Sequence, residues 1–510
     1  MKKIFFSTIA ISALFLNISC ETDFDTDVND VVVTSGDANF SKYIALGNSL
    51  TSGYRDNALY IDGQNESYPN IIANQMKRAG GGEFIQPLMS DNNGGMVLGN
   101  QTILGTKLFI ESFANGSPVL KNVAATPTTD VSKKLTGTIN NMGVPGAKSF
   151  HLVAPGYGSL AALATQRSNP YYVRFSTSET STIAGDAAAQ RPTFFSLWIG
   201  NNDVLSYATS GGSGIDQQGN LNPATYGSND ISDPAVVAGS IKGVLDALKA
   251  TGSTKGVIAN IPYVTSIPYF TTVPYNPLSP AALGANLATL NASLYGPLKQ
   301  ALTAFGHGNR INLLSATSAN PVLIKDNSLV NLSAQLTAAL TPSLGAPMAA
   351  AFGQIFGQAR QATAEDHVLL TASSVIATTN ANVPAPVNVN GVSYPLENQY
   401  VLTKTEAALV KTAVDAYNTQ ISTLATAYGL AFVNANAKMI ELNSMSGIQF
   451  DGVKYTAKFV TGGTFSLDGV HLTGRGYALV ANEFLKSINS KYKSNLPMVS
   501  PNSYSGVKFP

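Results

Sequence analysis

Residues 43–50 read Tyr-Ile-Ala-Leu-Gly-Asn-Ser-Leu, and this stretch decides how the chain folds. Its first four residues form a short apolar run that Gly47 closes, a pattern typical of a buried strand that feeds a turn. Runs of the same character lie at 194–199, 256–261 and 430–434. Apolar residues at helical spacing occupy 235–250, 404–427 and 473–489. Strands that alternate with helices predict an α/β fold, a doubly wound parallel sheet covered on both faces.

The composition is that of a globular protein with a large core, since 44% of the 510 residues are hydrophobic and 12% are charged. Several stretches fall outside a minimal α/β core: a Gly- and Asn-rich 60–135, a loop-like 205–232, a proline-rich 265–280, a helical 329–363 and an extended 376–400. No linker-like composition divides the chain after residue 40. We therefore expect one domain at 41–495, decorated by these insertions, and a C-terminal tail at 496–510.

The charge balance does not favour nucleic acid as a partner. The chain has 31 lysines and arginines against 30 aspartates and glutamates, for a net charge of +1. These charges form no basic stripe or cluster of the kind that binds a phosphate backbone. We expect no nucleic-acid partner.

The first 40 residues combine a secretory-signal pattern, the only cysteine of the chain and an acidic stretch. Lys2 and Lys3 precede an apolar run at 4–16, and the only cysteine, Cys20, follows a small residue. This order is typical of a secretory signal. The placement of the cysteine resembles a bacterial lipobox, which implies a signal peptide at 1–20, a lipidated Cys20 and an outer-membrane lipoprotein, on either face of that membrane. The acidic stretch 21–40 then serves as a solvated tether.

One residue departs from the lipobox pattern, because Asn17 stands where leucine is usual. The alternative is an ordinary signal peptide that is cleaved nearby and leaves Cys20 free or removes it. With no second cysteine, the folded chain cannot contain an internal disulfide.

Two polar side chains follow predicted strands directly. Ser49 comes after the first strand, and Asn202 comes after the strand at 194–199. Because the carboxyl ends of parallel strands meet at one edge of a sheet, both side chains are expected at the same crevice. There a serine can act as a nucleophile and an asparagine amide can donate to an oxyanion. Two simpler interpretations stay open, Ser49 as a helix N-cap and residues 201–203 as an ordinary turn.

Asp468 and His471 lie three residues apart in a loop that leads into the last predicted helix. This spacing lets the carboxylate reach the imidazole, fix its tautomer and stabilise the imidazolium that forms when histidine acts as a base. The glycine-rich stretch 143–147 can add a backbone N–H for an oxyanion, from Gly143 or Gly146, or it is only a turn.

Four segments resemble, in order and context, the sequence blocks of the SGNH/GDSL hydrolase family: residues 47–50, Gly146, residues 200–203 and residues 468–471. The resemblance implies a flavodoxin-like three-layer α/β/α fold with esterase or lipase activity. It also implies roles for the site residues, with Ser49 as nucleophile, His471 as general base and Asp468 as its orienting carboxylate. The implied oxyanion donors are the N–H groups of Ser49 and Gly146 and the side chain of Asn202. Asn48 departs from the family block, which has aspartate there, but that aspartate is not a triad member.

The sequence thus predicts a lipid-anchored serine ester hydrolase that works through an acyl-enzyme and needs no cofactor or metal. Its substrate is open between a lipid acyl ester and an O-acylated glycan. The insertions are where substrate choice is expected to lie. Residues 263–277, rich in Tyr, Phe and Pro, either form an apolar wall for an acyl chain or pack as ordinary core. The alternative function is a surface lipoprotein that binds a glycan or a partner on the same fold without turnover.

Overall fold

A computed structural model describes residues 32–114 and 116–510 of the chain. Within these ranges, the main sheet has five strands, all parallel and in the order β13-β8-β7-β1-β6. The strands are β1 (Tyr43–Gly47), β6 (Asn141–Gly143), β7 (Phe194–Trp198), β8 (Gly256–Ala259) and β13 (Ala431–Val433). Each of the four strands predicted from apolar runs is present, so the predicted parallel α/β sheet is confirmed.

The strand order explains where a ligand crevice must lie. Numbered by their place in the chain, the five strands are ordered 2-1-3-4-5, which is one of the two common doubly wound arrangements. The order reverses between β1 and β7, and ligands bind at the carboxyl ends of the strands that flank such a reversal. Ser49 follows β1 and Asn202 follows β7, so both stand at this switch point.

One strand of the main sheet, β6, the second of the five in chain order, escaped prediction. It has three residues, Asn141, Met142 and Gly143, and pairs with the end of β1. An asparagine and a glycine in so short a segment carry no apolar periodicity, and the stretch 143–147 was therefore interpreted as a turn throughout. That interpretation is corrected for Gly143, which belongs to the sheet.

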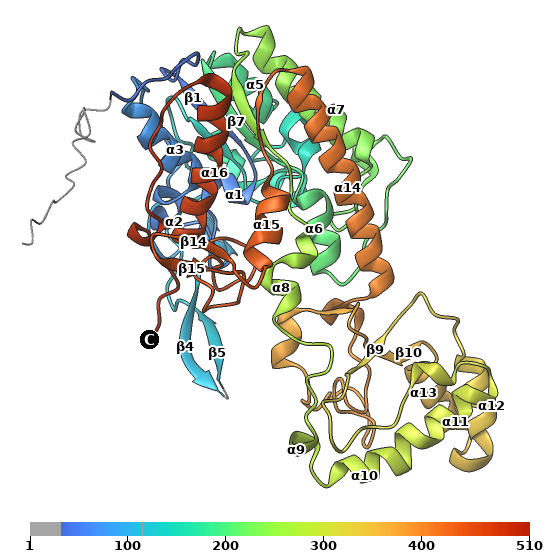
Figure 1. Cartoon of the computed structure of the whole chain (residues 1–510). Helices are drawn as coiled ribbons and strands as arrows, with labels where there is room; N and C mark the ends of the chain where they lie inside the picture. Colours follow the sequence, from blue (N-terminus) through green and yellow to red (C-terminus); the bar gives the residue numbers. More distant parts are fainter. Residues whose placement is uncertain (1–31, 115) are drawn as a thin grey trace, which may run out of the picture.

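Helices cover both faces of the sheet, as Figure 1 shows. On one face lie α3 (Tyr68–Lys77) and α16 (Gly474–Tyr492), and on the other lie α5 (Ile183–Ala189), α7 (Pro234–Ala250) and α14 (Lys404–Ala427). The helices predicted at 235–250, 404–427 and 473–489 correspond to α7, α14 and α16, and the helical stretch predicted at 329–363 contains α12 and α13. A capping box between Thr403 and Glu406 starts α14. The loop predicted at 205–232 is shorter than expected, because α6 (Asn202–Thr209) extends into it.

The folded body reaches beyond the predicted limits of 41 and 495. Asp37 donates its backbone N–H to the Tyr492 carbonyl, and the rings of Phe40 and Phe194 lie 5.0 Å apart. Near the other end of the chain, Ser505 bonds to Glu66. The last residues of the predicted tether and most of the predicted tail are therefore packed on the body. Residues 21–31 of the tether, like Cys20 and the predicted signal peptide, lie outside the described residues.

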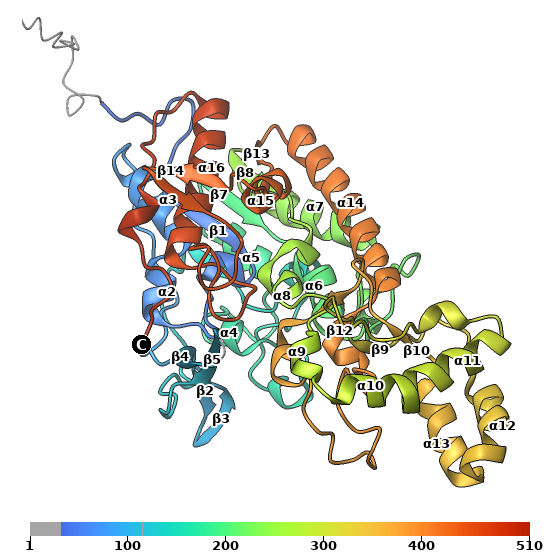
Figure 2. The ribbon, with the colours of Figure 1, turned by 60° about the horizontal axis from the view of Figure 1, so that its bottom comes forward.

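One insertion forms a lobe with its own hydrophobic core. This insertion lobe (residues 273–401) lies between β8 and α14 and projects from the sheet layer (Figures 1 and 2). Its elements are α9 (Pro280–Leu283), α10 (Asn286–Leu290), α11 (Gly296–Ala304), β9 (Leu323–Lys325), α12 (Ser333–Leu344), α13 (Ala346–Phe356) and β10 (Ala359–Gln361). The expectation of insertions that merely decorate one core is corrected here, since Tyr295 and Phe356 are fully buried within the lobe.

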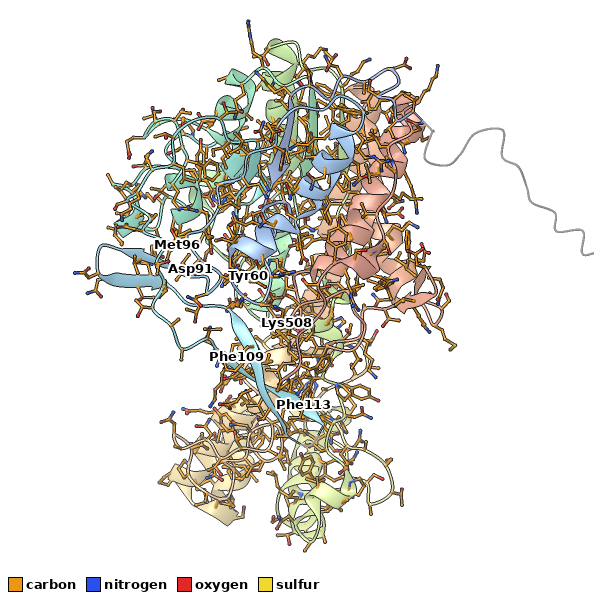
Figure 3. All side chains as sticks on the ribbon, turned by 90° about the vertical axis from the view of Figure 1, so that its left-hand side faces the viewer. Tyr60, Asp91, Met96, Phe109, Phe113 and Lys508 are labelled. Atoms are coloured by element: carbon orange, nitrogen blue, oxygen red, sulfur yellow. The ribbon has the colours of Figure 1, made fainter. Side chains whose placement is uncertain are left out.

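The stretch 60–135 was expected outside the core, but its first part supplies α3, which packs on the sheet, and only the part from 96 to 122 forms two antiparallel hairpins. They are β2 (Met96–Leu98) with β3 (Gln101–Leu104), and β4 (Leu108–Ala114) with β5 (Ser117–Asn122). The β4–β5 hairpin carries Phe109 and Phe113 away from the sheet, toward the end of the molecule where the insertion lobe lies (Figures 1 and 3).

Candidate active site

The structure brings Ser49, His471 and Asp468 together into a continuous hydrogen-bonded relay. His471 Nε2 lies 2.9 Å from the Ser49 hydroxyl oxygen, and His471 Nδ1 lies 2.9 Å from Asp468 Oδ2. Because the carboxylate accepts a hydrogen bond from Nδ1–H, the Nε2 lone pair is left to accept from the serine hydroxyl. Residues separated by more than 400 positions in the chain therefore form a nucleophile, a base and an orienting carboxylate in the predicted order.

The end of β1 places Ser49 with little freedom. Gly47 has no room for a side chain, because an added Cβ would collide with the Thr51 side chain and the Trp198 carbonyl. Asn48 is the N-cap of the short helix α1 (Ser49–Ser52), and its side chain accepts from the Leu50 N–H at 3.0 Å. Ser49 is the first helical residue, so its possible interpretation as the N-cap is excluded and its hydroxyl is free to face His471.

Asp468 is held as a carboxylate by a set of donors. Its Oδ1 accepts from the backbone N–H groups of Val470 (2.9 Å) and His471 (2.8 Å), and its Oδ2 accepts from Asn57 N–H at 2.9 Å. Burial alone would raise the pKa of this carboxyl, but His471 and the N–H donors outweigh burial and hold the pKa well below its usual range. Gly469 allows the tight turn, with a φ of +70°. Asp468 therefore stays ionised while it orients the histidine.

Asn202 begins α6 at the end of β7 and is buried beside the nucleophile. Its Nδ2 donates to the Ala147 carbonyl at 2.9 Å, which fixes the direction of the amide. An asparagine amide carries two N–H donors, so one remains for an oxyanion. The Ser49 backbone N–H belongs to the first helical turn, whose N–H groups have no partner inside the helix. Both predicted donors are thus present at the same end of the sheet.

Hydrogen bonds decide which of Gly143 and Gly146 has a backbone N–H that can donate to an oxyanion. Gly143 donates its N–H to Asn141 Oδ1 at 3.0 Å, and its Cα packs directly on α1, where no side chain would fit. Gly146 is exposed, adopts a φ of +81°, and its N–H has no acceptor among the residues that the structure describes. Of the two glycines, Gly146 is the one with a donor to offer.

Three further residues hold the site together and were given no role in the sequence analysis. The Tyr54 ring lies 4.6 Å from the His471 ring, and the Tyr54 hydroxyl donates to the Asn57 carbonyl. Asp56 Oδ1 accepts from Leu467 N–H at 3.1 Å and so links the segment after α1 to the histidine loop. In the sequence, the only feature that could have pointed to Tyr54 and Asp56 is that they closely follow Ser49.

The third, Asp203, is fully buried directly after Asn202. Its carboxylate accepts from the backbone N–H (2.8 Å) and the hydroxyl (2.9 Å) of Ser149. Burial raises the pKa of Asp203, against the opposing effect of these bonds. The segment that carries Gly146 is thereby tied to the start of α6. This holds the two predicted oxyanion donors, Gly146 and Asn202, in fixed positions relative to each other.

His367 is the other histidine that closely follows an acidic residue in the sequence, and its partner is a backbone carbonyl. Its Nδ1 lies 3.3 Å from the Phe270 carbonyl, while the neighbouring Asp366 is bound by Arg360 at 2.6 Å. Across residues 32–114 and 116–510, no group of three His, Cys, Asp or Glu side chains is arranged to hold a metal ion. In the same part of the chain, no helix is both long and apolar enough to cross a membrane.

The relay opens into a cavity of about 220 Å³ that Ser49, Asn202 and His471 help to line. Of the apolar stretch 263–277, Val264 and Ile267 line this cavity. Phe270 is instead 2% exposed and packs in the main core. Ordinary packing therefore describes Phe270, while Val264 and Ile267 also face the cavity, where the acyl-wall interpretation stays a prediction.

Comparisons with known proteins add no assignment, because no protein-family model and no curated protein sequence matches the chain.

Proposed function

We propose that this protein is a serine ester hydrolase that works through an acyl-enzyme. The observation that carries the proposal is the relay from Ser49 through His471 to Asp468, with both steps at 2.9 Å. A protein that only binds a glycan or a partner has no use for a serine hydroxyl aimed at a histidine whose second nitrogen is held by a buried carboxylate.

The chemistry follows from the geometry. Ser49 Oγ attacks the ester carbonyl carbon while His471 Nε2 takes the hydroxyl proton, and Asp468 stabilises the imidazolium that forms. The carbonyl oxygen becomes an oxyanion, for which the N–H groups of Ser49, Gly146 and Asn202 are the donors. His471 then returns the proton to the leaving alcohol as the C–O bond breaks. Water, activated by the same histidine, hydrolyses the acyl-enzyme and restores Ser49.

The proposal extends to family and anchoring. The 2-1-3-4-5 strand order is that of flavodoxin-like folds, and the site residues fall where the SGNH/GDSL resemblance requires them. This supports membership of that family, with Asn48 serving as the helix cap in place of aspartate. We also propose that Cys20 carries a lipid and anchors the enzyme in the outer membrane, which mass spectrometry of the N-terminal peptide from native membranes can test.

Covalent labelling tests the catalytic assignment directly. The full chain, solubilised in the steroid detergent CHAPS, is treated with a p-nitrophenyl alkylphosphonate, and the modified residue is mapped by peptide mass. We expect one phosphonate on Ser49, and no labelling in His471→Ala, because the hydroxyl then lacks its base. Ser343→Ala, at an exposed position in the insertion lobe, is the matched control and should label like wild type. Labelling of another serine, or undiminished labelling of Ser49→Ala, would refute the proposal.

A further inference from the structure

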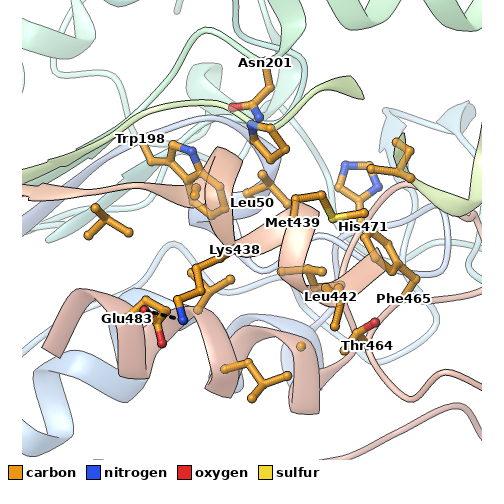
Figure 4. A pocket seen from close by; sticks show the side chains of 18 of the residues that line it. Leu50, Trp198, Asn201, Lys438, Met439, Leu442, Thr464, Phe465, His471 and Glu483 are labelled. Atoms are coloured by element: carbon orange, nitrogen blue, oxygen red, sulfur yellow. Dashed lines mark ion pairs between the residues drawn. The ribbon is translucent and has the colours of Figure 1, made fainter. Parts of the chain in front are cut away.

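The cavity next to Ser49 continues away from the catalytic relay, between two helices. One wall is α15 (Ala435–Asn443), which follows β13, and the other is α16. Figure 4 shows His471 at one side of the cavity, with Met439 of α15 directed toward it. Along α16 the lining residues extend from Gly476 to Lys486, a helical rise of about 15 Å. The cavity is therefore deeper than an oxyanion site needs.

The walls of this cavity are aliphatic and aromatic. Residues that line it include Leu50, Trp198, Met439, Leu442, Leu479 and Val480. Its volume of about 220 Å³ exceeds that of an engineered apolar cavity of about 150 Å³ that binds benzene. A polar acyl group would leave these walls without a partner, whereas a hydrocarbon chain would fill them.

The end of the cavity away from His471 carries charged side chains. Lys438 of α15 and Glu483 of α16 form an ion pair at 3.5 Å that bridges the two walls, and Lys486 binds Glu483 at 2.7 Å (Figure 4). Because one end of the cavity has the catalytic relay and the other has charged side chains, a bound ester has one favoured orientation. An acyl carbonyl fits at Ser49, and the chain points toward the ion pair.

None of the residues that line the cavity belongs to the insertion lobe. α15 is instead attached to the sheet edge, through Asn436, whose N–H donates to Asn260 Oδ1 at 3.0 Å, and through Asn443, whose Nδ2 donates to the Ser266 carbonyl at 2.9 Å. The expectation that the large insertions select the substrate does not fit this arrangement of the acyl side.

We propose that this cavity is an acyl-chain site, lined by α15 and α16, that selects esters of medium-length aliphatic acids over acetyl esters. Its volume suits chains of roughly six to ten carbons. This inference rests on the proposed ester hydrolase function and names the class of its substrate. Each methylene that enters the cavity contributes about a fourfold gain in kcat/KM, until the chain reaches the Lys438–Glu483 pair.

The only tryptophan of the chain reports on occupancy without any turnover. Trp198 lines the cavity and is 3% exposed, so solutes in bulk water do not reach its ring. In the full-length Ser49→Ala protein in CHAPS, 8-bromooctanoate should quench this fluorescence saturably, because its bromine enters the cavity. Bromoacetate at the same concentration should quench no more than it quenches free N-acetyltryptophanamide.

A kinetic experiment uses the same cavity in the active enzyme. At about fourfold for each of six added methylenes, the ratio of kcat/KM for p-nitrophenyl octanoate to that for the acetate should be on the order of 10³ or more in wild type. Val480→Phe fills the cavity from α16 and should lower this ratio at least tenfold. Val330→Phe makes the same change at a position in the insertion lobe that is 61% exposed, and the ratio should stay as in wild type. Ala435→Phe, on the opposite wall, replaces Val480→Phe if that variant does not fold.

The outcomes separate this proposal from the one on which it rests. Quenching by 8-bromooctanoate without hydrolysis of any ester would keep the apolar site and refute the hydrolase. Ester hydrolysis without saturable quenching, or with an octanoate-to-acetate ratio that both cavity-filling variants leave unchanged, would keep the hydrolase and overturn the acyl-chain site.

Discussion

The carboxyl edge of the sheet and the insertion lobe differ in how many polar groups they bury. At the sheet edge, buried polar side chains such as Asp468, Asn202 and Asp203 each have named partners, and they converge on one serine. The insertion lobe has its own apolar core. From residue 273 to 359 its only charged residues are Lys299, Arg310, Lys325 and Asp326. The lobe combines this apolar core with few buried charges, whereas at the sheet edge several buried polar groups gather around one serine.

A buried ion cluster inside the lobe ties it to the start of α14, and Leu370 of the lobe also packs on Gly469 of the histidine loop. Arg360 binds Asp326 at 2.7 Å and Asp366 at 2.6 Å, and Asp366 also accepts from the Lys404 N–H at the start of α14. A carboxylate at a helix N-terminus is favoured by the helix dipole. The comparison teaches that buried charge in the lobe ties its own segments together and to the start of α14, while buried charge at the sheet edge orients Ser49 and His471.

The largest expected effect is on catalysis at the sheet edge. Ser49→Ala and His471→Ala should each lower kcat for a short p-nitrophenyl ester by roughly 10⁴–10⁶-fold, because nucleophile and base act as one unit. For the same reason the double variant should be no slower than the slower single variant. The measurement is initial-rate kinetics with folding checked by circular dichroism. Additive losses in the double variant would mean that the two residues do not work together.

Removal of the ion cluster should make the insertion lobe and the sheet unfold at different urea concentrations. The Arg360 side chain is 8% exposed, and Arg360→Met leaves two buried carboxylates without their cation. We expect the free energy of unfolding to fall by about 3–5 kcal/mol, with activity per folded molecule retained. Urea unfolding followed both by Trp198 fluorescence and by far-UV circular dichroism should then give transitions that no longer coincide.

Arg78→Met is the matched control for this change, since Arg78 is exposed on the body. Its effect should stay within about 0.5 kcal/mol. An Arg360→Met protein as stable as this control would show that the lobe is not held by the cluster.

Loss of one oxyanion donor is expected to be smaller than loss of the nucleophile. Asn202→Ala should lower kcat on the order of 10²–10³-fold. The variant also loses the bond to the Ala147 carbonyl, so its thermal unfolding is measured alongside the kinetics. Asn382→Ala, an exposed position in the lobe, should leave kcat unchanged. A fall in stability with full kcat would make Asn202 a purely structural residue.

The smallest effect concerns pH and stability. The pKa of Asp468 is lowered in the folded state, so its ionised form stabilises the fold above the ordinary aspartate pKa of about 4. This contribution is lost as the pH falls through the lowered pKa. The difference in free energy of unfolding between wild type and Asp468→Asn should therefore shrink as the pH is lowered from about 6 to about 3. Urea titrations across this range measure it, and a difference that widens toward low pH would contradict the origin assigned to the shift.

Sequence reasoning succeeded where a local pattern carries the physical signal. Apolar runs closed by glycine located β1 and β7, and helical spacing located α14 and α16. It failed at β6, because three residues with one apolar side chain have no period to detect. It also could not separate Gly143 from Gly146, since the difference is which N–H is already bonded, and that depends on the side chain of Asn141 folding back on the strand.

The sequence by itself determined the parallel α/β plan and the identity of Ser49, Asn202, Asp468 and His471 as the residues to examine. Strand and helix propensities and the order of polar residues after strands act over a few positions, so they can be read along the chain. Only the tertiary structure decided that Ser49 and His471 lie within hydrogen-bond distance, that residues 273–401 close around a second core, and that α15 and α16 enclose an apolar cavity. Those facts depend on contacts between segments far apart in the chain, and no local pattern encodes them.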